Sequence, residues 1–360
     1  MGELLESKKF SPLNLAFSLV FSNMFSVNPL TAAVVAGLLP SAFAAANSKT
    51  APKGLDTLTV GVIGVDTAQY VGEICALKNC SAFISVGDNF YDSGVDFTTG
   101  GILRFEEAWV NMYTQGVFEY APWYQCIGNH DVVKSDAGVY FETTIAPLYD
   151  DRWYFGTENL QYYTYDLEGK DWSATFVVVD SDCFLSSYQK PTSVYYNNYT
   201  QTCNKNKQVQ VDFLAETFAK SKADWKFLQL HHPFMSAATN ETDLQPLIDI
   251  VYEHNAIVLN GHDHCLAHYV YNNTNFILSG AAGYPQAGDC NNGVSLGPYT
   301  KYLGANDLAA ANGFVTMDIN KQSVVIEWYA RDMTFENGDL YPVSHDLTPS
   351  HSTTIKTKAK

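Results

Sequence analysis

Short apolar runs with strand-like composition recur along the chain and alternate with segments of helical periodicity. Several runs are apolar at successive positions, as strands covered on both faces are. The predicted strands are 58–63, 82–86, 123–127, 175–179, 226–230, 256–259 and 276–278. The predicted helices are 67–78, 102–114, 209–221 and 243–254. This alternation indicates an α/β fold.

Two further segments complete the organisation after residue 50. Residues 313–329 predict two strands in a hairpin, and residues 182–207, rich in Tyr, Asn and Ser, have no periodicity and predict a surface loop. No linker or internal repeat divides this part of the chain. A length of 360 residues would allow two domains, but the pattern favours one.

The first 50 residues differ from the rest and resemble a long secretory signal peptide. Lys8 and Lys9 precede an apolar stretch whose most apolar part is 30–39, and small residues follow Pro40. We expect cleavage after residue 46. The alternative is an uncleaved signal anchor, although Asn28 and Pro29 interrupt a clean membrane span.

Glycosylation motifs and cysteines agree with export. Four Asn-x-Ser/Thr sequons occur, at Asn79, Asn198, Asn240 and Asn272. The seven cysteines are an odd number, and Cys126 lies in an apolar run, so we expect it to be a buried free thiol. Other pairings stay open for the remaining six, but the pairs we expect are Cys183 with Cys203, Cys265 with Cys290, and Cys75 with Cys80.

The charge balance excludes some classes of function. Lys and Arg total 21 and Asp and Glu total 38, which gives a formal net charge of -17. A chain this acidic does not bind nucleic acid by neutralising its backbone. Anionic substrates remain compatible with it, because a metal ion can supply positive charge locally.

Side chains that can bind metal ions follow four of the predicted strands. They form the segments GDNFY (87–91), GNHD (128–131), HH (231–232) and GHDH (261–264). Each segment alone is compatible with a turn whose polar groups bond to the backbone. Ligands gather outside the carboxyl ends of strands in α/β sheets, so four such segments together favour a metal site.

The residue types narrow the chemistry of that site. Carboxylate, amide and imidazole groups suit first-row ions, and a carboxylate can bridge two of them. Two ions about 3.5–4 Å apart can hold a phosphate ester and a hydroxide for in-line attack. Tyr91, three residues after Asp88, adds a phenolate that favours Fe(III). The chain has 23 tyrosines, so Tyr91 could simply pack, but its place in the motif favours a ligand.

The four segments, in this order, resemble those of the purple acid phosphatases, in particular the short, single-domain, tartrate-resistant type within the calcineurin-like metallophosphoesterases. The resemblance extends from about residue 55 to about residue 341. It implies a four-layer α/β/β/α sandwich with two mixed β-sheets. It also implies a binuclear centre of Fe(III) and a second divalent ion, Fe or Zn, with Mn a further option.

The resemblance also assigns roles to individual residues. It implies that Asp88 bridges the two ions and that His130 stands beside the phosphate as an outer-sphere acid or anchor. The ligands it assigns to Fe(III) are Tyr91 and His264, and those it assigns to the divalent ion are Asn129, His231 and His262.

Two departures from the family pattern concern further site residues. The first motif of the family places an Fe(III) ligand where this chain has Val65, and Asp66 comes one residue late. Either an incorrect gene model omits an exon after Gly64, or Asp66 turns back to reach the metal, or the Fe(III) site is weakened. Where animal enzymes carry another phosphate-side histidine, this chain has Asn240. Either His232 replaces it, or Glu241 or Asp243 acts there, or the role is absent.

These inferences predict a secreted, monomeric acid phosphatase that hydrolyses small phosphate monoesters by attack of a metal-held hydroxide. The expected organisation is a signal peptide (1–46), a linker (47–54), a catalytic domain (55–345) and a C-terminal tail (346–360). We expect no stable membrane span after signal removal. One rival is a metallophosphoesterase with diester or nucleotide specificity. The other is a catalytically degenerate secreted binding protein, which the shifted first motif would explain.

Overall fold

The computed structural model describes residues 58–63, 68–98, 100–133, 136–158, 160–236, 239, 241–283, 297–304, 311–336, 339–342 and 346–357. The signal peptide and linker predicted over 1–54 lie outside these residues. The described residues all belong to one compact unit, Lys49–Lys360. No helix within the described ranges is long and apolar enough to cross a membrane.

The strands form two mixed sheets. In spatial order the first contains β14 (Asp339–Pro342), β13 (Ser323–Glu336), β12 (Ala311–Ile319), β1 (Leu58–Ile63), β2 (Ala82–Ser85), β3 (Trp123–Tyr124) and β4 (Trp153–Tyr154), and β15 (His351–Lys356) pairs with β13. Strands β1 to β4 are parallel, whereas β12, β13, β14 and β15 pair in antiparallel fashion. Part of the tail expected over 346–360 therefore belongs to this sheet.

The second sheet has parallel strands in its centre. Its order is β11 (Thr300–Leu303), β9 (Leu266–Tyr271), β10 (Thr274–Ser279), β8 (Ile257–Asn260), β7 (Trp225–Gln229), β6 (Ser173–Val178) and β5 (Tyr163–Glu168). Strands β10, β8, β7 and β6 are parallel to one another, and the other three pair in antiparallel fashion. The carboxyl ends of these parallel strands lead into the HH and GHDH segments.

The helical segments lie on the outer faces of the sheets or within the connections between strands. They are α4 (Ala68–Lys78), α5 (Gly101–Phe105), the π-helix η3 (Glu106–Val110), η4 (Gly116–Glu119), α6 (Asn129–Val132), α7 (Asp136–Tyr140), the π-helix η5 (Phe141–Ile145), α8 (Ala146–Tyr149), η6 (Ser181–Cys183), η7 (Ser186–Gln189), α9 (Asn198–Lys220), η8 (Thr242–Leu244), α10 (Gln245–His254) and η9 (Gly297–Tyr299). The predicted helix over 102–114 ends at Val110, and the helices between 129 and 149 were not predicted.

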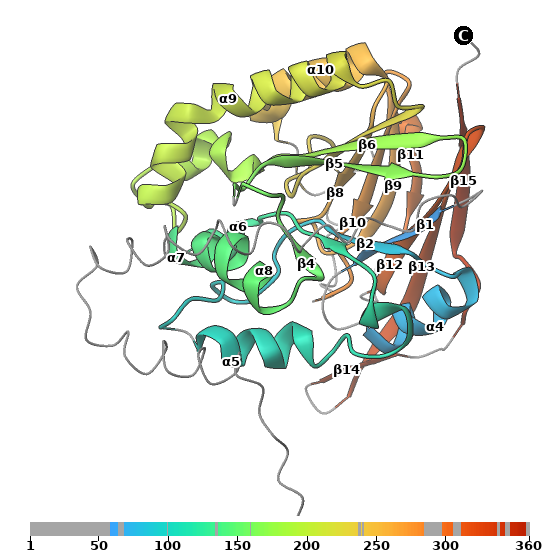
Figure 1. Cartoon of the computed structure of the whole chain (residues 1–360), viewed down its shortest axis with the longest axis horizontal. Helices are drawn as coiled ribbons and strands as arrows, with labels where there is room; N and C mark the ends of the chain where they lie inside the picture. The colour runs from blue at the N-terminus through green and yellow to red at the C-terminus, as the bar shows by residue number, and fades with distance from the viewer. Residues whose placement is uncertain are drawn as a thin grey trace, which may run out of the picture. The chain divides into compact units, whose positions relative to one another are not determined.

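Successive side chains of the central strands point alternately into two separate cores. In β6, Phe176 belongs to the core that the two sheets share with Val315 of β12. Its neighbour Val177 belongs to a second core with Leu214 of α9 and Ile248 of α10. Figure 1 shows α9 and α10 side by side over the second sheet. Together with α4 on the first sheet, these layers confirm the α/β/β/α sandwich predicted from the sequence.

The prediction of a loop over 182–207 is wrong in its second half, because α9 begins at Asn198. Asn197 caps this helix: its side chain accepts a hydrogen bond from the Thr200 amide at 3.1 Å, and the Thr200 hydroxyl accepts one from the Asn197 amide at 3.2 Å. The first turns bury Thr200 and Cys203 rather than large apolar residues. The helix therefore has no apolar periodicity that could be read there.

The cysteine assignments are confirmed where the structure describes them. Cys75 pairs with Cys80 and Cys183 pairs with Cys203. Cys126 is a buried free thiol, as its apolar surroundings predict. Cys265 is disulfide-bonded, whereas Cys290 lies outside the described residues.

Candidate metal centre

The GDNFY segment turns sharply at the end of β2. Gly87 and Asp88 both have left-handed backbone angles, with φ of 94° and 56°. A Cβ at Gly87 would lie 2.6 Å from His231 Nδ1 and 2.9 Å from the Gly128 amide nitrogen. Only glycine fits at this position, because the loop after β2 approaches both the GNHD loop and the end of the second sheet.

The Asp88 carboxylate lies between two groups of potential ligands. Its Oδ1 accepts a hydrogen bond from the His130 backbone amide at 2.9 Å. Its Oδ2 accepts one from the Tyr91 hydroxyl at 2.9 Å and lies 3.3 Å from His231 Nε2. Tyr91 Oη is in turn 2.9 Å from His264 Nε2. One carboxylate thus contacts the Tyr91–His264 pair on one side and the His231 group on the other.

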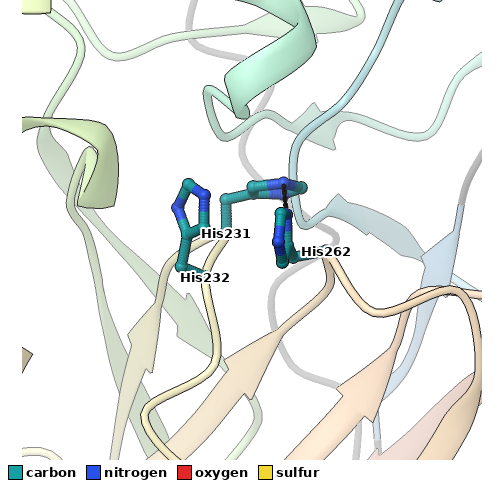
Figure 2. Close-up of side chains that lie close together, drawn as sticks. All are labelled: His231, His232 and His262. Carbon is teal, nitrogen blue, oxygen red and sulfur yellow. Dashed lines mark hydrogen bonds between the residues drawn. The ribbon is translucent and has the colours of Figure 1, made fainter. Parts of the chain in front are cut away.

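The second group consists of Asn129, His231 and His262. Asn129 Oδ1 lies 2.9 Å from both His231 Nε2 and His262 Nδ1, and these two nitrogens are 3.2 Å apart. Figure 2 shows the two imidazole rings meeting through these nitrogens, with His232 beside them. Three donor atoms from α6, the end of β7 and the turn after β8 therefore converge on one point.

The orientation of the His231 ring is fixed by a hydrogen bond on the side that faces away from Asn129 and His262. Its Nδ1 is 2.7 Å from the carbonyl oxygen of Val86. Because a carbonyl only accepts, Nδ1 carries a proton, so in the neutral form of the ring the lone pair lies on Nε2 and faces Asn129 and His262. This is the tautomer that a metal ligand requires.

The two residues expected to act on the phosphate lie in different surroundings. His130 is partly exposed, its Nδ1 is 2.7 Å from the carbonyl oxygen of Asp92, and its ring lies 4.3 Å from that of Tyr91. His232 is fully buried, with Nδ1 2.8 Å from Ser181 Oγ and Nε2 2.8 Å from Tyr188 Oη. Asp66, Val65 and Asn240 lie outside the described residues.

Burial and the close contacts shift the pKa values of the clustered groups. Burial raises the pKa of the Asp88 carboxyl, but the His231, His130 and His262 rings lower it further, so that it lies well below its usual range. Burial and then His231 lower the pKa of His262 to about 3. Burial and Asp88 raise the pKa of the Tyr91 phenol. The metal-free cluster therefore holds a carboxylate, a neutral imidazole and a protonated phenol.

A buried network that the sequence did not reveal joins the two loops of the first sheet. Asp131 Oδ2 accepts hydrogen bonds from the amides of Gly128 and Asn89 at 2.9 and 3.2 Å. Asn89 Nδ2 donates to Glu142 Oε2 at 2.8 Å. Burial and the neighbouring Asp88 raise the pKa of Asp131 to about 7. These bonds hold Asp88 and Asn129, which flank the network, at a fixed separation.

The donor set fits a binuclear metal site. Carboxylate, phenol, amide and imidazole atoms are combined without a thiolate, as hard to intermediate first-row ions prefer. Asp88 contacts both groups, which suits a bridging carboxylate. A cavity of about 200 Å³ opens beside them. The side chains that line it include Asp88, Tyr91, Arg104, His231, His262 and His264.

Comparison with protein families supports this interpretation. Residues 65–266 match the family model of calcineurin-like phosphoesterases. Purple acid phosphatase 17 of Arabidopsis thaliana is 28% identical over 233 residues, which are 62% of this chain and 65% of that protein. For purple acid phosphatase 3 of the same plant the identity is 29%, over 62% of this chain and 60% of that protein. The chain thus spans less than two thirds of these relatives.

A human protein and a solved structure extend the comparison. Tartrate-resistant acid phosphatase type 5 of Homo sapiens is 23% identical, over 72% of this chain and 79% of that protein. GAP50, the anchor in the inner membrane complex of Plasmodium, superposes with a TM-score of 0.61 at 14% identity, covering 84% of this chain and 90% of its own. This last likeness is one of fold.

Proposed function

This chain belongs to the calcineurin-like phosphoesterase family, and we propose that it is an acid phosphatase that hydrolyses phosphate monoesters at a binuclear metal centre. The observation that carries the proposal is the position of Asp88, whose Oδ2 is 2.9 Å from Tyr91 Oη and 3.3 Å from His231 Nε2. The similarity to plant and animal acid phosphatases supports the same activity.

We assign the ligands according to the two groups in the structure. Tyr91 and His264 would hold Fe(III), Asn129, His231 and His262 would hold a divalent ion, and Asp88 would join the two. Asp66 remains the candidate for a further Fe(III) ligand. Two ions bound here would supply a nucleophile derived from water and neutralise charge on the phosphoryl oxygens.

His130 is the proposed acid or anchor beside the phosphate. Its Nδ1 donates to the carbonyl of Asp92, because a carbonyl oxygen can only accept. The other nitrogen, Nε2, can then donate a proton only in the imidazolium form. A leaving alkoxide would therefore receive its proton from the imidazolium form of His130.

The role of His232 differs from that of His130. Both of its ring nitrogens are within 2.8 Å of protein hydroxyls, those of Ser181 and Tyr188. Its ring lies 4.4 Å from that of His262. We therefore place His232 behind a metal ligand, where it supports His262, rather than in direct contact with the phosphate.

Export and glycosylation complete the proposal. The sequon residues Asn79, Asn198 and Asn272 are exposed, which suits attachment of a glycan. If the chain is secreted through the glycosylating pathway, glycosidase treatment of the secreted protein will lower its mass. An unchanged mass would contradict the glycosylated state.

The activity is tested with p-nitrophenyl phosphate as a monoester and bis(p-nitrophenyl) phosphate as a diester. We expect the wild type to hydrolyse the monoester faster and His262→Ala to lose at least about a thousandfold in kcat/KM. His254→Ala, a histidine substitution at the end of α10, is the matched control. Faster diester hydrolysis would favour the rival specificity, and equal turnover by the two variants would contradict the assigned site.

A further inference from the structure

We propose that Tyr195 is a positioning residue that keeps the side-chain oxygen of Asn129 facing the metal. Asn129 Nδ2 donates a hydrogen bond to Tyr195 Oη at 2.8 Å. The inference rests on the proposed metal centre, but it concerns a residue outside the four ligand segments. Tyr195 comes from the connection between η7 and α9, far from GNHD in the sequence.

The orientation of an amide ligand matters because its two ends have opposite character. Asn129 is 1% exposed, and its Oδ1 lies 2.9 Å from both His231 Nε2 and His262 Nδ1. A rotation of 180° would place the NH₂ group at that point instead. The NH₂ group would then donate to the histidine lone pairs that a cation needs, and it would point its own protons at the cation.

In the observed orientation the Tyr195 hydroxyl accepts from Asn129 Nδ2, so this buried N–H group keeps a partner while Oδ1 faces the metal site. If this hydroxyl is removed, Asn129 Nδ2 loses this acceptor in a buried environment, which destabilises the productive orientation. The amide can recover a partner by rotating toward His231 and His262. The metal-free chain would then favour the orientation that cannot bind a cation, and metal binding would have to reverse it.

The structure holds Tyr195 firmly against α6. Asn197 Nδ2 donates to the carbonyl oxygen of Val132, the last residue of α6, at 2.6 Å. Thr200 Oγ1 donates to the carbonyl oxygen of Tyr195 at 2.7 Å. The Tyr195 ring lies 4.3 Å from that of Tyr188. Two hydrogen bonds and a ring contact therefore fix the hydroxyl relative to the helix that carries Asn129.

The neighbouring residue provides a matched control. Tyr196 is 41% exposed, so Tyr196→Phe removes a hydroxyl from the same segment without touching the site. Tyr195→Phe keeps the ring and its packing on Tyr188, and thermal unfolding of the metal-free variants checks that both fold. Asn129→Asp supplies a second test, because a carboxylate presents oxygen at both ends and has no wrong orientation.

The experiment measures the Kd of Zn²⁺ for the metal-depleted full chain by competition with a chromogenic chelator. We expect Tyr195→Phe to raise the Kd at least about tenfold, as loss of a residue behind a metal ligand typically does, and Tyr196→Phe to leave it within about twofold. In the Asn129→Asp background, Tyr195→Phe should change the Kd less than about threefold, because the two substitutions act on the same orientation.

The outcomes separate this inference from the proposed function. Equal Kd values for Tyr195→Phe and the wild type would overturn the inference, as would an equal loss in the Asn129→Asp background. Suppose that the wild type binds Zn²⁺ tightly and Tyr195→Phe weakens this binding, but the wild type hydrolyses no phosphate ester. This result would overturn the acid phosphatase proposal and leave the inference about Tyr195 standing. A wild-type chain that binds no Zn²⁺ would overturn both.

Discussion

The side-chain amide of Gln229 donates a hydrogen bond to the carbonyl oxygen of Ser85 at 2.7 Å. Gln229 is the last residue of β7 and Ser85 the last of β2, so the bond joins the two sheets at the ends that carry the site. Gln229 Nε2 also lies 3.1 Å from the carbonyl oxygen of Tyr124, and its Oε1 accepts from Tyr165. Gly87 and His231 come two residues after the ends of these strands.

Replacing Gln229 with Leu should destabilise the fold. The leucine has a similar volume but leaves the buried partners of the amide without a hydrogen bond, at a cost of about 1–3 kcal/mol in the free energy of unfolding. Urea denaturation measures this loss. Gln208→Leu on the exposed face of α9 is the control and should change the free energy by less than about 0.5 kcal/mol. Equal effects of the two substitutions would refute the role of the Gln229 amide.

His268 of β9 should make stability depend on pH outside the metal site. It is 2% exposed, its Nε2 is 2.9 Å from Asn275 Oδ1, and its ring stacks on Trp328 at 5.1 Å. His351 Nε2 of β15 lies 3.5 Å from His268 Nδ1. His351 and Lys301 of β11 are the neighbouring groups whose positive charge disfavours a protonated His268. Burial is the main cause that lowers the pKa of His268 to about 4.

The direction of the pH dependence follows from a comparison of His268 in the folded and the unfolded chain. The unfolded chain takes up a proton on His268 near pH 6.5, whereas the folded chain resists it until about pH 4. This contribution to stability is complete above pH 6.5 and is lost as the pH falls toward 4. Between pH 7 and 4 the wild type should lose up to about 3 kcal/mol more than His268→Gln. Parallel pH curves from urea denaturation would contradict the assignment.

Tyr91 should give a spectroscopic signature of the bound iron. A tyrosinate ligand to Fe(III) produces a visible charge-transfer band, so the iron-loaded chain should be purple, and Tyr91→Phe should lose the band. Tyr120→Phe, at an exposed position, should keep it. A colourless wild type that contains Fe(III) would show that Tyr91 is not a ligand, and a Zn- or Mn-only chain would lack the band from the start.

The α/β class and the ligand clusters could be predicted because each depends on local sequence, whereas the four-layer sandwich was implied by the family resemblance. Several central strands are apolar at successive positions, such as β2 and β8, and GDNFY, GNHD, HH and GHDH each come at or just after the end of a predicted strand. The hairpin of β12 and β13 was predicted for the same reason. GDNFY follows a strand of the first sheet and GHDH a strand of the second, so the meeting of Tyr91 and His264, 173 positions apart, was predicted by the family resemblance and not by the edge of a single sheet.

The supporting contacts could not be predicted, because no local pattern encodes them. Asn89 and Glu142 are 53 residues apart and Gln229 and Ser85 are 144 apart, and each is an unremarkable polar residue in its own segment. The start of α9 was hidden by its polar first turns. Tyr195 lies within the surface loop predicted over 182–207, and nothing in that segment indicates that its hydroxyl is hydrogen-bonded to Asn129.

The metal content of the purified chain tests the central claim most directly. The wild type, produced with Fe and Zn supplied, should contain two metal ions per chain by inductively coupled plasma mass spectrometry. Asp88→Asn should lower this content, whereas Asp92→Asn, at an exposed neighbouring carboxylate, should retain it. A wild-type chain that contains one metal ion or none would contradict the binuclear centre and favour a secreted binding protein instead.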